Sequence, residues 1–212
     1  MNFLDKGQSG LIYLNSYRNN ISKCFKDKQK YFHEKHILLI LKEKKICNHA
    51  EIVSYDDNKK IIITKYIPHN LERLCADEIN LKKLKSIDRD LLIYNILIIL
   101  DSLHKYEICH CDFKAKNLQL NESHEPYIID FDTSVVEFND YEDLYKLMCE
   151  DLHKMKLLII QLINIINYKS SYIQYETHIK KIKKKSPVLH KLLISKDYNI
   201  KELVEYFMIK CD

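Results

Sequence analysis

The sequence predicts an α+β fold with a small, β-rich first lobe, residues 1–67, and a larger, mostly helical second lobe, residues 68–212. Short β-compatible runs bounded by polar turn residues fill the first third of the chain, which is the pattern of antiparallel hairpins. From about Asn70 onward, apolar residues recur at helical spacing. A chain of 212 residues can bury the core that such a unit needs.

Two hairpins and one helix are expected in the first lobe. Residues 11–14 and 21–25 are short apolar runs joined by a polar turn, and residues 51–55 and 60–67 form a second pair of this kind. Between the two hairpins, side chains recur at the three- and four-residue intervals of a helix. The residues that set this interval are Phe32, His36, Leu39 and Ile40.

The second lobe is interrupted by residues 108–136, which contain two short predicted strands at 118–120 and 127–129. These strands flank acidic residues, and an active site could be built at the edge of a cleft there. The helices of this lobe are expected at 71–76, 89–106 and 144–166.

The composition excludes several other classes of protein. The longest apolar runs, 91–100 and 157–166, are interrupted by polar residues and are shorter than the roughly 18–20 residues that a membrane helix needs. The start of the chain lacks a secretory signal, and the seven cysteines have no paired CxxC spacing. A net charge of +4 is too small to predict nucleic-acid binding. We therefore expect a cytoplasmic protein with reduced thiols.

Glycine use is the most unusual feature of the composition. The chain has two glycines, Gly7 and Gly10, where an average usage of about 7% would give about fifteen. Both lie in one four-residue stretch, which indicates a backbone requirement that other residues do not meet. An ordinary hairpin turn is the alternative. Because the rest of the chain has no glycine, we favour a loop that approaches phosphate groups closely.

Three polar residues have the spacing of a phosphoryl-transfer site. Asp112 and Asn117 lie five residues apart across a predicted loop, so a carboxylate could meet a substrate hydroxyl while the amide reaches a metal ion. Asp130 ends an apolar strand, from which its carboxylate could bind Mg²⁺. Phosphoryl transfer needs such groups because the phosphate charge must be neutralised and the attacking hydroxyl oriented.

The motif around these residues resembles the catalytic loop and metal-binding motif of protein kinases. Residues 110–117 have the sequence HCDFKAKN, and a DFD motif begins eighteen residues after Asp112. The resemblance implies a bilobal protein-kinase-like fold that binds ATP and Mg²⁺ between its lobes. It also implies that Asp112 orients and deprotonates the acceptor hydroxyl and that Lys114 stabilises the transferring charge. Asn117 and Asp130 are the implied ligands of Mg²⁺.

The resemblance extends upstream in the order that the family requires. The start of the chain resembles the glycine-rich loop, with Asp5 in place of its first glycine, and the few residues before it predict a short first strand. Lys23 is similar to the lysine that binds the ATP phosphates and Glu34 to its ion-pair partner, while Lys26 is a rival for Lys23. Residues 61–67 resemble the strand and hinge that hold adenine. The implied ATP-binding residues are Gly7, Gly10, Ile12, Lys23, Glu34, Thr64, Lys65, Tyr66 and Ile67.

The resemblance covers roughly residues 4–165 and leaves the C-terminal tail unassigned. Asp151 is similar to the structural aspartate that opens the next long helix, and His110 is expected to be a packed scaffold residue. The cysteines beside His110 do not predict a zinc site, because adjacent ligands point alternately and no second pair completes a tetrahedron. The lysine run at 180–185 predicts a solvated helix face, with an anionic partner as the alternative.

Departures from the family pattern bear on the substrate. Cys111 replaces the arginine that would contact a phosphorylated activation loop, so control by such phosphorylation is not expected. Asp132 stands where the motif normally has glycine, and no Ala-Pro-Glu-like segment lies between Asp130 and Asp151. The short segment and the sequence IDFD resemble small-molecule phosphotransferases, such as aminoglycoside, choline and lipopolysaccharide-sugar kinases, or compact atypical protein kinases. Lys114, by contrast, is characteristic of serine/threonine protein kinases.

The first hypothesis for function is therefore an ATP-dependent serine/threonine protein kinase. One alternative is a kinase that acts on a small molecule or sugar, and a second is an inactive kinase-like module that regulates a partner. The expected partners are ATP and a protein or small molecule that carries the acceptor hydroxyl.

Overall fold

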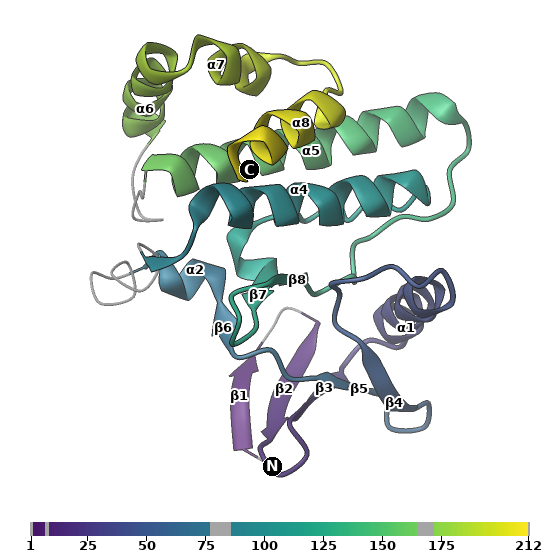
Figure 1. The fold of residues 1–212 in the computed structure, drawn as a ribbon. Coiled ribbons are helices and arrows are strands. Elements are labelled where there is room, and N and C mark those ends of the chain that lie inside the picture. The colour runs from purple at the N-terminus through teal and green to yellow at the C-terminus, as the bar shows by residue number, and fades with distance from the viewer. Residues whose placement is uncertain (1, 7–8, 77–85, 165–171, 212) are drawn as a thin grey trace.

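The computed structural model describes residues 2–6, 9–76, 86–164 and 172–211. Within these ranges the chain has the predicted α+β class, with a five-stranded antiparallel sheet, a second sheet of three short strands, and several helices. Figure 1 shows the larger sheet at one end of the molecule and a stack of helices, including α4, α5 and α8, at the other.

The five-stranded sheet contains both predicted hairpins. Its strand order is β1-β2-β3-β5-β4, and every neighbouring pair is antiparallel. β1 has five residues, as many as β4 and β5, so the first strand is not as short as the sequence predicts. All of its residues are exposed at the edge of the sheet. The strands are β1 (Asn2–Lys6), β2 (Gly10–Asn15), β3 (Asn20–Phe25), β4 (Ile52–Asp56) and β5 (Ile61–Lys65).

Gly10 is required by close packing at the start of β2. Its φ angle is not positive, so the left-handed conformation is not the reason for glycine here. A Cβ atom at this position would lie 2.2 Å from the carbonyl oxygen of Cys24 and 3.2 Å from the Cα atom of Phe25 in the paired strand β3. Neither is the movable end of a side chain, so a larger residue must push the two strands apart.

We expect Gly10→Ala to lower the free energy of unfolding by about 1–3 kcal/mol, the usual cost of overpacking. Urea denaturation followed by circular dichroism measures this change. Ser16→Ala, in the exposed turn after β2, is the matched control and should change stability by less than about 0.5 kcal/mol. Equal stability of Gly10→Ala and the wild type would contradict the close-packing account.

Helix α1 (Lys28–Glu43) lies against strands β3, β4 and β5. It begins after Asp27, whose side chain accepts hydrogen bonds from the backbone N–H groups of Gln29 and Lys30. The predicted helix is confirmed. Of the four residues that set its interval, Phe32 and His36 are exposed, whereas Leu39 and Ile40 are partly buried against the core. The buried face instead comprises Tyr31, Glu34, Ile37, Leu38 and Leu41.

The rest of the chain builds a helical stack over the smaller sheet (Figure 1). Helix α4 packs against α5 and α8, and the core between them includes Leu97, Met155 and Phe207. The elements are β6 (His69–Asn70), α2 (Leu71–Leu74), α4 (Arg89–Lys105), η1 (Ala115–Asn117), β7 (Leu118–Leu120), β8 (Pro126–Ile128), α5 (Tyr141–Asn164), α6 (Tyr172–Lys185), α7 (Pro187–Ile194) and α8 (Ile200–Cys211).

Two features of this part correct or complete the sequence analysis. Helix α5 begins at Tyr141, so Asp151 lies well inside the helix and does not open it. The lysines at 180–185 are exposed on α6 around the buried Ile182, as a solvated face requires, and an anionic partner for them stays a prediction. None of the described helices combines the length and apolar character needed to cross a membrane.

Candidate active site

A pocket of about 410 Å³ lies between the five-stranded sheet and the loop of residues 110–117. All but two of the predicted site residues line it. Gly7 lies outside the described residues, and Gly10 packs against β3 without lining the pocket. The predicted residues that do line the pocket are Ile12, Lys23, Glu34, Thr64, Lys65, Tyr66, Ile67, Asp112, Lys114, Asn117 and Asp130.

Lys23 is the centre of one polar group in the pocket. Its Nζ atom lies 2.6 Å from Glu34 Oε2 and 2.5 Å from Asp130 Oδ1. Lys23 comes from β3, Glu34 from the buried face of α1 and Asp130 from the loop after β8, so the ion pairs join three separate elements. Lys26, the rival lysine, is exposed and does not line the pocket.

The electrostatics of this group keep Lys23 charged. Burial alone would lower the pKa of Lys23, but the carboxylates of Glu34 and Asp130 outweigh burial and raise it above its ordinary value. Burial raises the pKa of Glu34 to about 7, although Lys23 opposes this change. The pocket therefore holds a permanent cation that could bind phosphate groups.

Asp112, Lys114 and Asn117 form a second polar group. Lys114 Nζ lies 2.8 Å from Asp112 Oδ1 and 2.7 Å from Oδ2. Asn117 Nδ2 donates to both Asp112 Oδ2 and the Asp112 backbone carbonyl, each at 2.9 Å. The carboxylate of Asp112 is thus held in one orientation by two neighbours from its own loop.

The donor set fits a hard cation such as Mg²⁺. Both hydrogen bonds of the Asn117 amide use Nδ2, which leaves Oδ1 as the atom suited to a metal ion. The side chain of Asp130 is 37% exposed and lines the same pocket. Oxygen ligands from carboxylates and amides are those that Mg²⁺ prefers. Asn117 and Asp130 are therefore a chemically suitable pair of ligands.

His110 connects the two polar groups through the backbone. Its Nε2 lies 3.1 Å from the carbonyl oxygen of Ile129, and its Nδ1 lies 3.3 Å from the backbone N–H of Asp112. Burial lowers the pKa of His110, so the ring is neutral and can donate through Nε2 while accepting at Nδ1. His110 is thus the buried scaffold residue that the sequence predicts.

Two residues of the site have left-handed backbone conformations. The φ angles of Cys111 and Asp130 are 62° and 68°. Non-glycine residues adopt this region at an energetic cost and tend to do so at functional sites, where the surroundings enforce it. Asp151 holds this conformation at Cys111, because its carboxylate accepts from the backbone N–H groups of His110 at 2.7 Å and Cys111 at 2.9 Å.

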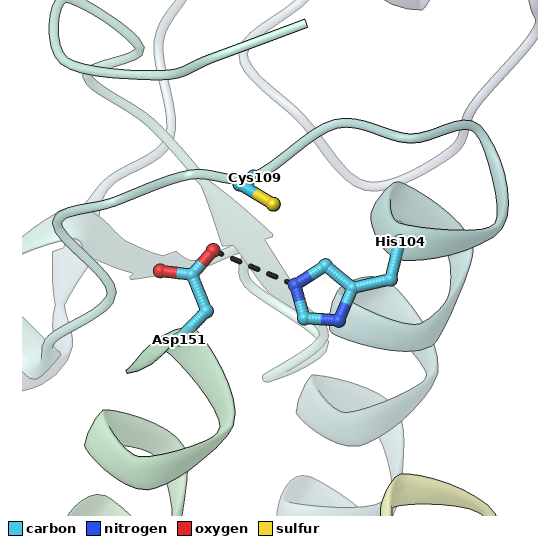
Figure 2. A group of neighbouring side chains, drawn as sticks. All are labelled: His104, Cys109 and Asp151. Carbon is cyan, nitrogen blue, oxygen red and sulfur yellow. Dashed lines mark hydrogen bonds and ion pairs between the residues drawn. The ribbon is translucent and has the colours of Figure 1, made fainter. Parts of the chain in front are cut away.

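Asp151 also belongs to a buried group with His104 and Cys109 (Figure 2), whose ligand atoms all lie within 4.8 Å of one another. His104 Nε2 is 3.5 Å from Asp151 Oδ2, and its Nδ1 is 2.8 Å from the hydroxyl of Tyr198. Burial and the nearby Asp151 raise the pKa of the Cys109 thiol, which opposes the thiolate that a metal needs. Because both Asp151 oxygens already accept backbone hydrogen bonds, this group fits an anchor for the loop of residues 110–117 better than a metal centre.

Sequence reasoning missed several residues of the pocket. Ile21 and Ile62 add to its apolar wall. Their place in the pocket could have been predicted, because Ile21 lies two residues from Lys23 and Ile62 two residues from Thr64, and side chains two apart on a strand share a face. Asp132 also lines the pocket. Its carboxylate accepts from the hydroxyl of Ser9, a contact with no sequence signal because 123 residues separate the partners.

The segment after Asp130 is short. Residues 131–140 contain no helix or strand, and an isolated bridge pairs Val135 with Cys109 before α5 begins at Tyr141. His33 of α1 holds the same segment through a 2.7 Å contact between its Nε2 and the carbonyl oxygen of Ser134. The chain therefore passes from Asp130 to α5 through a connection that has neither a helix nor a strand.

Comparison with known proteins adds no relative: no protein-family model matches the chain, and no curated protein matches it. The assignment of function therefore depends on the residues of the pocket and their geometry.

Proposed function

We propose that this chain is an ATP-dependent phosphotransferase with a protein-kinase-like arrangement of two lobes, residues 1–67 and 68–212, and that its acceptor is a serine or threonine hydroxyl of a protein. One observation carries the proposal. The Lys23 group and the Asp112 group, which come from distant parts of the chain, face a single pocket that also has an apolar wall. Its volume of about 410 Å³ is within the usual range for small-molecule sites.

The residues have complementary roles in this proposal. The apolar wall and the backbone of residues 64–67 would hold adenine, and Lys23 would bind the phosphates. Asn117 and Asp130 would hold Mg²⁺, which neutralises phosphate charge when bound. Asp112 would accept the proton of the acceptor hydroxyl. At the same time the hydroxyl oxygen would bond to the γ-phosphorus, and the bond between that phosphorus and the leaving oxygen of ADP would break. Lys114, already beside Asp112, would stabilise the charge of the transferring group.

A small-molecule or sugar acceptor is the second candidate. The short segment 131–140 favours it, because that segment offers neither a helix nor a strand on which a peptide could lie. Lys114 favours the protein acceptor. Transfer of labelled phosphate to a mixture of basic proteins, compared with transfer to a set of hydroxylated metabolites, distinguishes the two classes.

We expect Lys23→Met to weaken the binding of ATP and Mg²⁺ by about 10- to 100-fold, because hydrogen bonds to charged groups contribute about 1.5–3 kcal/mol. Isothermal titration calorimetry measures the affinity directly. Lys26→Met removes the neighbouring exposed lysine and is the matched control, with an expected change of less than about twofold. Equal effects of the two substitutions would reject the assignment of Lys23, and a wild-type protein that binds no nucleotide would reject the proposed function.

A further inference from the structure

We infer that Asp132 is a positioning residue for the side of the pocket that carries Lys23 and Asp130, because it ties Ser9 and helix α1 to the segment that follows Asp130. The inference rests on the proposed function and adds to it a means by which the site is assembled. Asp132 occupies the place where the kinase motif normally has glycine. The contacts of its carboxylate with Ser9 and Lys30 explain why an aspartate stands there.

The contacts of Asp132 come from two other parts of the chain. Its Oδ2 atom accepts a hydrogen bond from the hydroxyl of Ser9, which immediately precedes β2. The same oxygen lies 3.3 Å from Nζ of Lys30, in the first turns of α1. Only 8% of the Asp132 side chain is exposed, and Ser9 is also buried. A buried carboxylate with a hydroxyl donor and an ammonium partner forms charge-assisted hydrogen bonds, which are the stronger kind.

These contacts act on the same helix that positions Lys23. Lys30 and Glu34 are four residues apart on α1 and therefore lie on one face, with Lys30 bound to Asp132 and Glu34 bound to Lys23. His33 adds a third contact from α1, to the carbonyl oxygen of Ser134. The position of α1 relative to Asp130 is thus fixed by side chains of the chain itself.

Cys111 indicates that the contacts of Asp132, and not a phosphorylated residue, order this part of the site. A cysteine there has no cationic group with which to bind a phosphorylated segment, so a phosphate could not organise the site through it. The Ser9–Asp132–Lys30 contacts, which we call the latch, fix the segment and the helix without a modification. The helix that the latch holds also carries Glu34, whose ion pair with Lys23 completes the Lys23–Glu34–Asp130 group.

A direct role for Asp132 as a metal ligand is the competing explanation, because Asp132 lines the pocket together with Asp130. The two roles make different predictions. A positioning role operates through Ser9 and Lys30, so substitution of either partner reproduces the effect of changing Asp132. A metal-binding role depends on the carboxylate alone and disappears when magnesium is removed.

The experiment measures ADP affinity in EDTA, without any metal, for Ser9→Ala, Lys30→Met, Asp132→Asn and the double variant Ser9→Ala/Asp132→Asn. We expect each single substitution to weaken ADP binding by about five- to tenfold, and the double variant to be no weaker than the worse single one, as for residues in one network. Glu137→Gln in the same segment and Lys42→Met in the same helix are the matched controls, because both residues are exposed and neither takes part in the latch contacts. Both controls should bind ADP like the wild type.

A second readout needs no nucleotide. In the apo protein, the losses of melting temperature caused by Ser9→Ala and Asp132→Asn should not add in the double variant. Additive losses, or normal ADP affinity of Ser9→Ala and Lys30→Met, would overturn the inference. So would an effect of Asp132→Asn that appears only as a higher magnesium requirement.

If Asp132→Asn does not fold, Ser9→Ala combined with Lys30→Met tests the same network. A wild type that binds no ADP would reject the proposed function, while the melting temperatures would still test the latch.

Discussion

Asp112→Asn should lower the rate of phosphoryl transfer by about 10²- to 10⁴-fold, the usual contribution of a general base, while changing ATP affinity by less than about twofold. The amide keeps the size of the carboxylate and one acceptor oxygen for Lys114 or Asn117, so the loop should keep its shape. It cannot accept the proton of the acceptor hydroxyl. Transfer from radiolabelled ATP measures the rate, and calorimetry measures the affinity.

The control for this prediction is Asp56→Asn. Asp56 accepts backbone hydrogen bonds in the β4–β5 turn, a role that asparagine can also fill, and it does not line the pocket. Its substitution should leave transfer unchanged. An Asp112→Asn variant as active as the wild type would exclude Asp112 as the base. ATP binding by a wild type that transfers phosphate to no acceptor would instead favour the inactive regulatory module.

Most of the pocket residues were predicted from the resemblance to protein kinases, and local geometry accounts for one part of the set. Asp112, Lys114 and Asn117 lie within one loop, so their spacing alone brings their side chains together. Lys23 lies on a predicted strand and Glu34 on a predicted helix, so only their meeting with Asp130 depended on the tertiary fold.

The parts that could not be predicted depend on contacts between distant segments. The helical interval alone did not give the buried face of α1. Phe32 and His36 share that interval but are exposed, whereas packing against the sheet selects the face that carries Glu34. The role of Gly10 depends on the backbone of β3, and that of Asp132 on Ser9. No local pattern contains either pairing.

Asp151→Ala should lower the free energy of unfolding by about 2–6 kcal/mol. Asp151 is fully buried, and its removal leaves the backbone N–H groups of His110 and Cys111 without their acceptor, at about 1–3 kcal/mol for each buried donor. The left-handed conformation of Cys111 would also lose the contact that holds it. Since domains of this kind are stable by about 5–15 kcal/mol, the loss is a large fraction of the total. Urea denaturation measures it.

Asp151→Asn separates the anchor from a metal centre. Asparagine keeps one acceptor oxygen for the backbone N–H groups, so this variant should lose less stability than Asp151→Ala. Because the anchor works without a metal, zinc should not raise the melting temperature of the wild-type protein. A stabilisation by zinc that disappears in both Asp151 variants and in Cys109→Ser would mean that the group in Figure 2 binds a metal after all. A loss below about 1 kcal/mol for Asp151→Ala would show that the loop of residues 110–117 keeps its shape without this carboxylate, and that the contacts of His110 suffice to hold it.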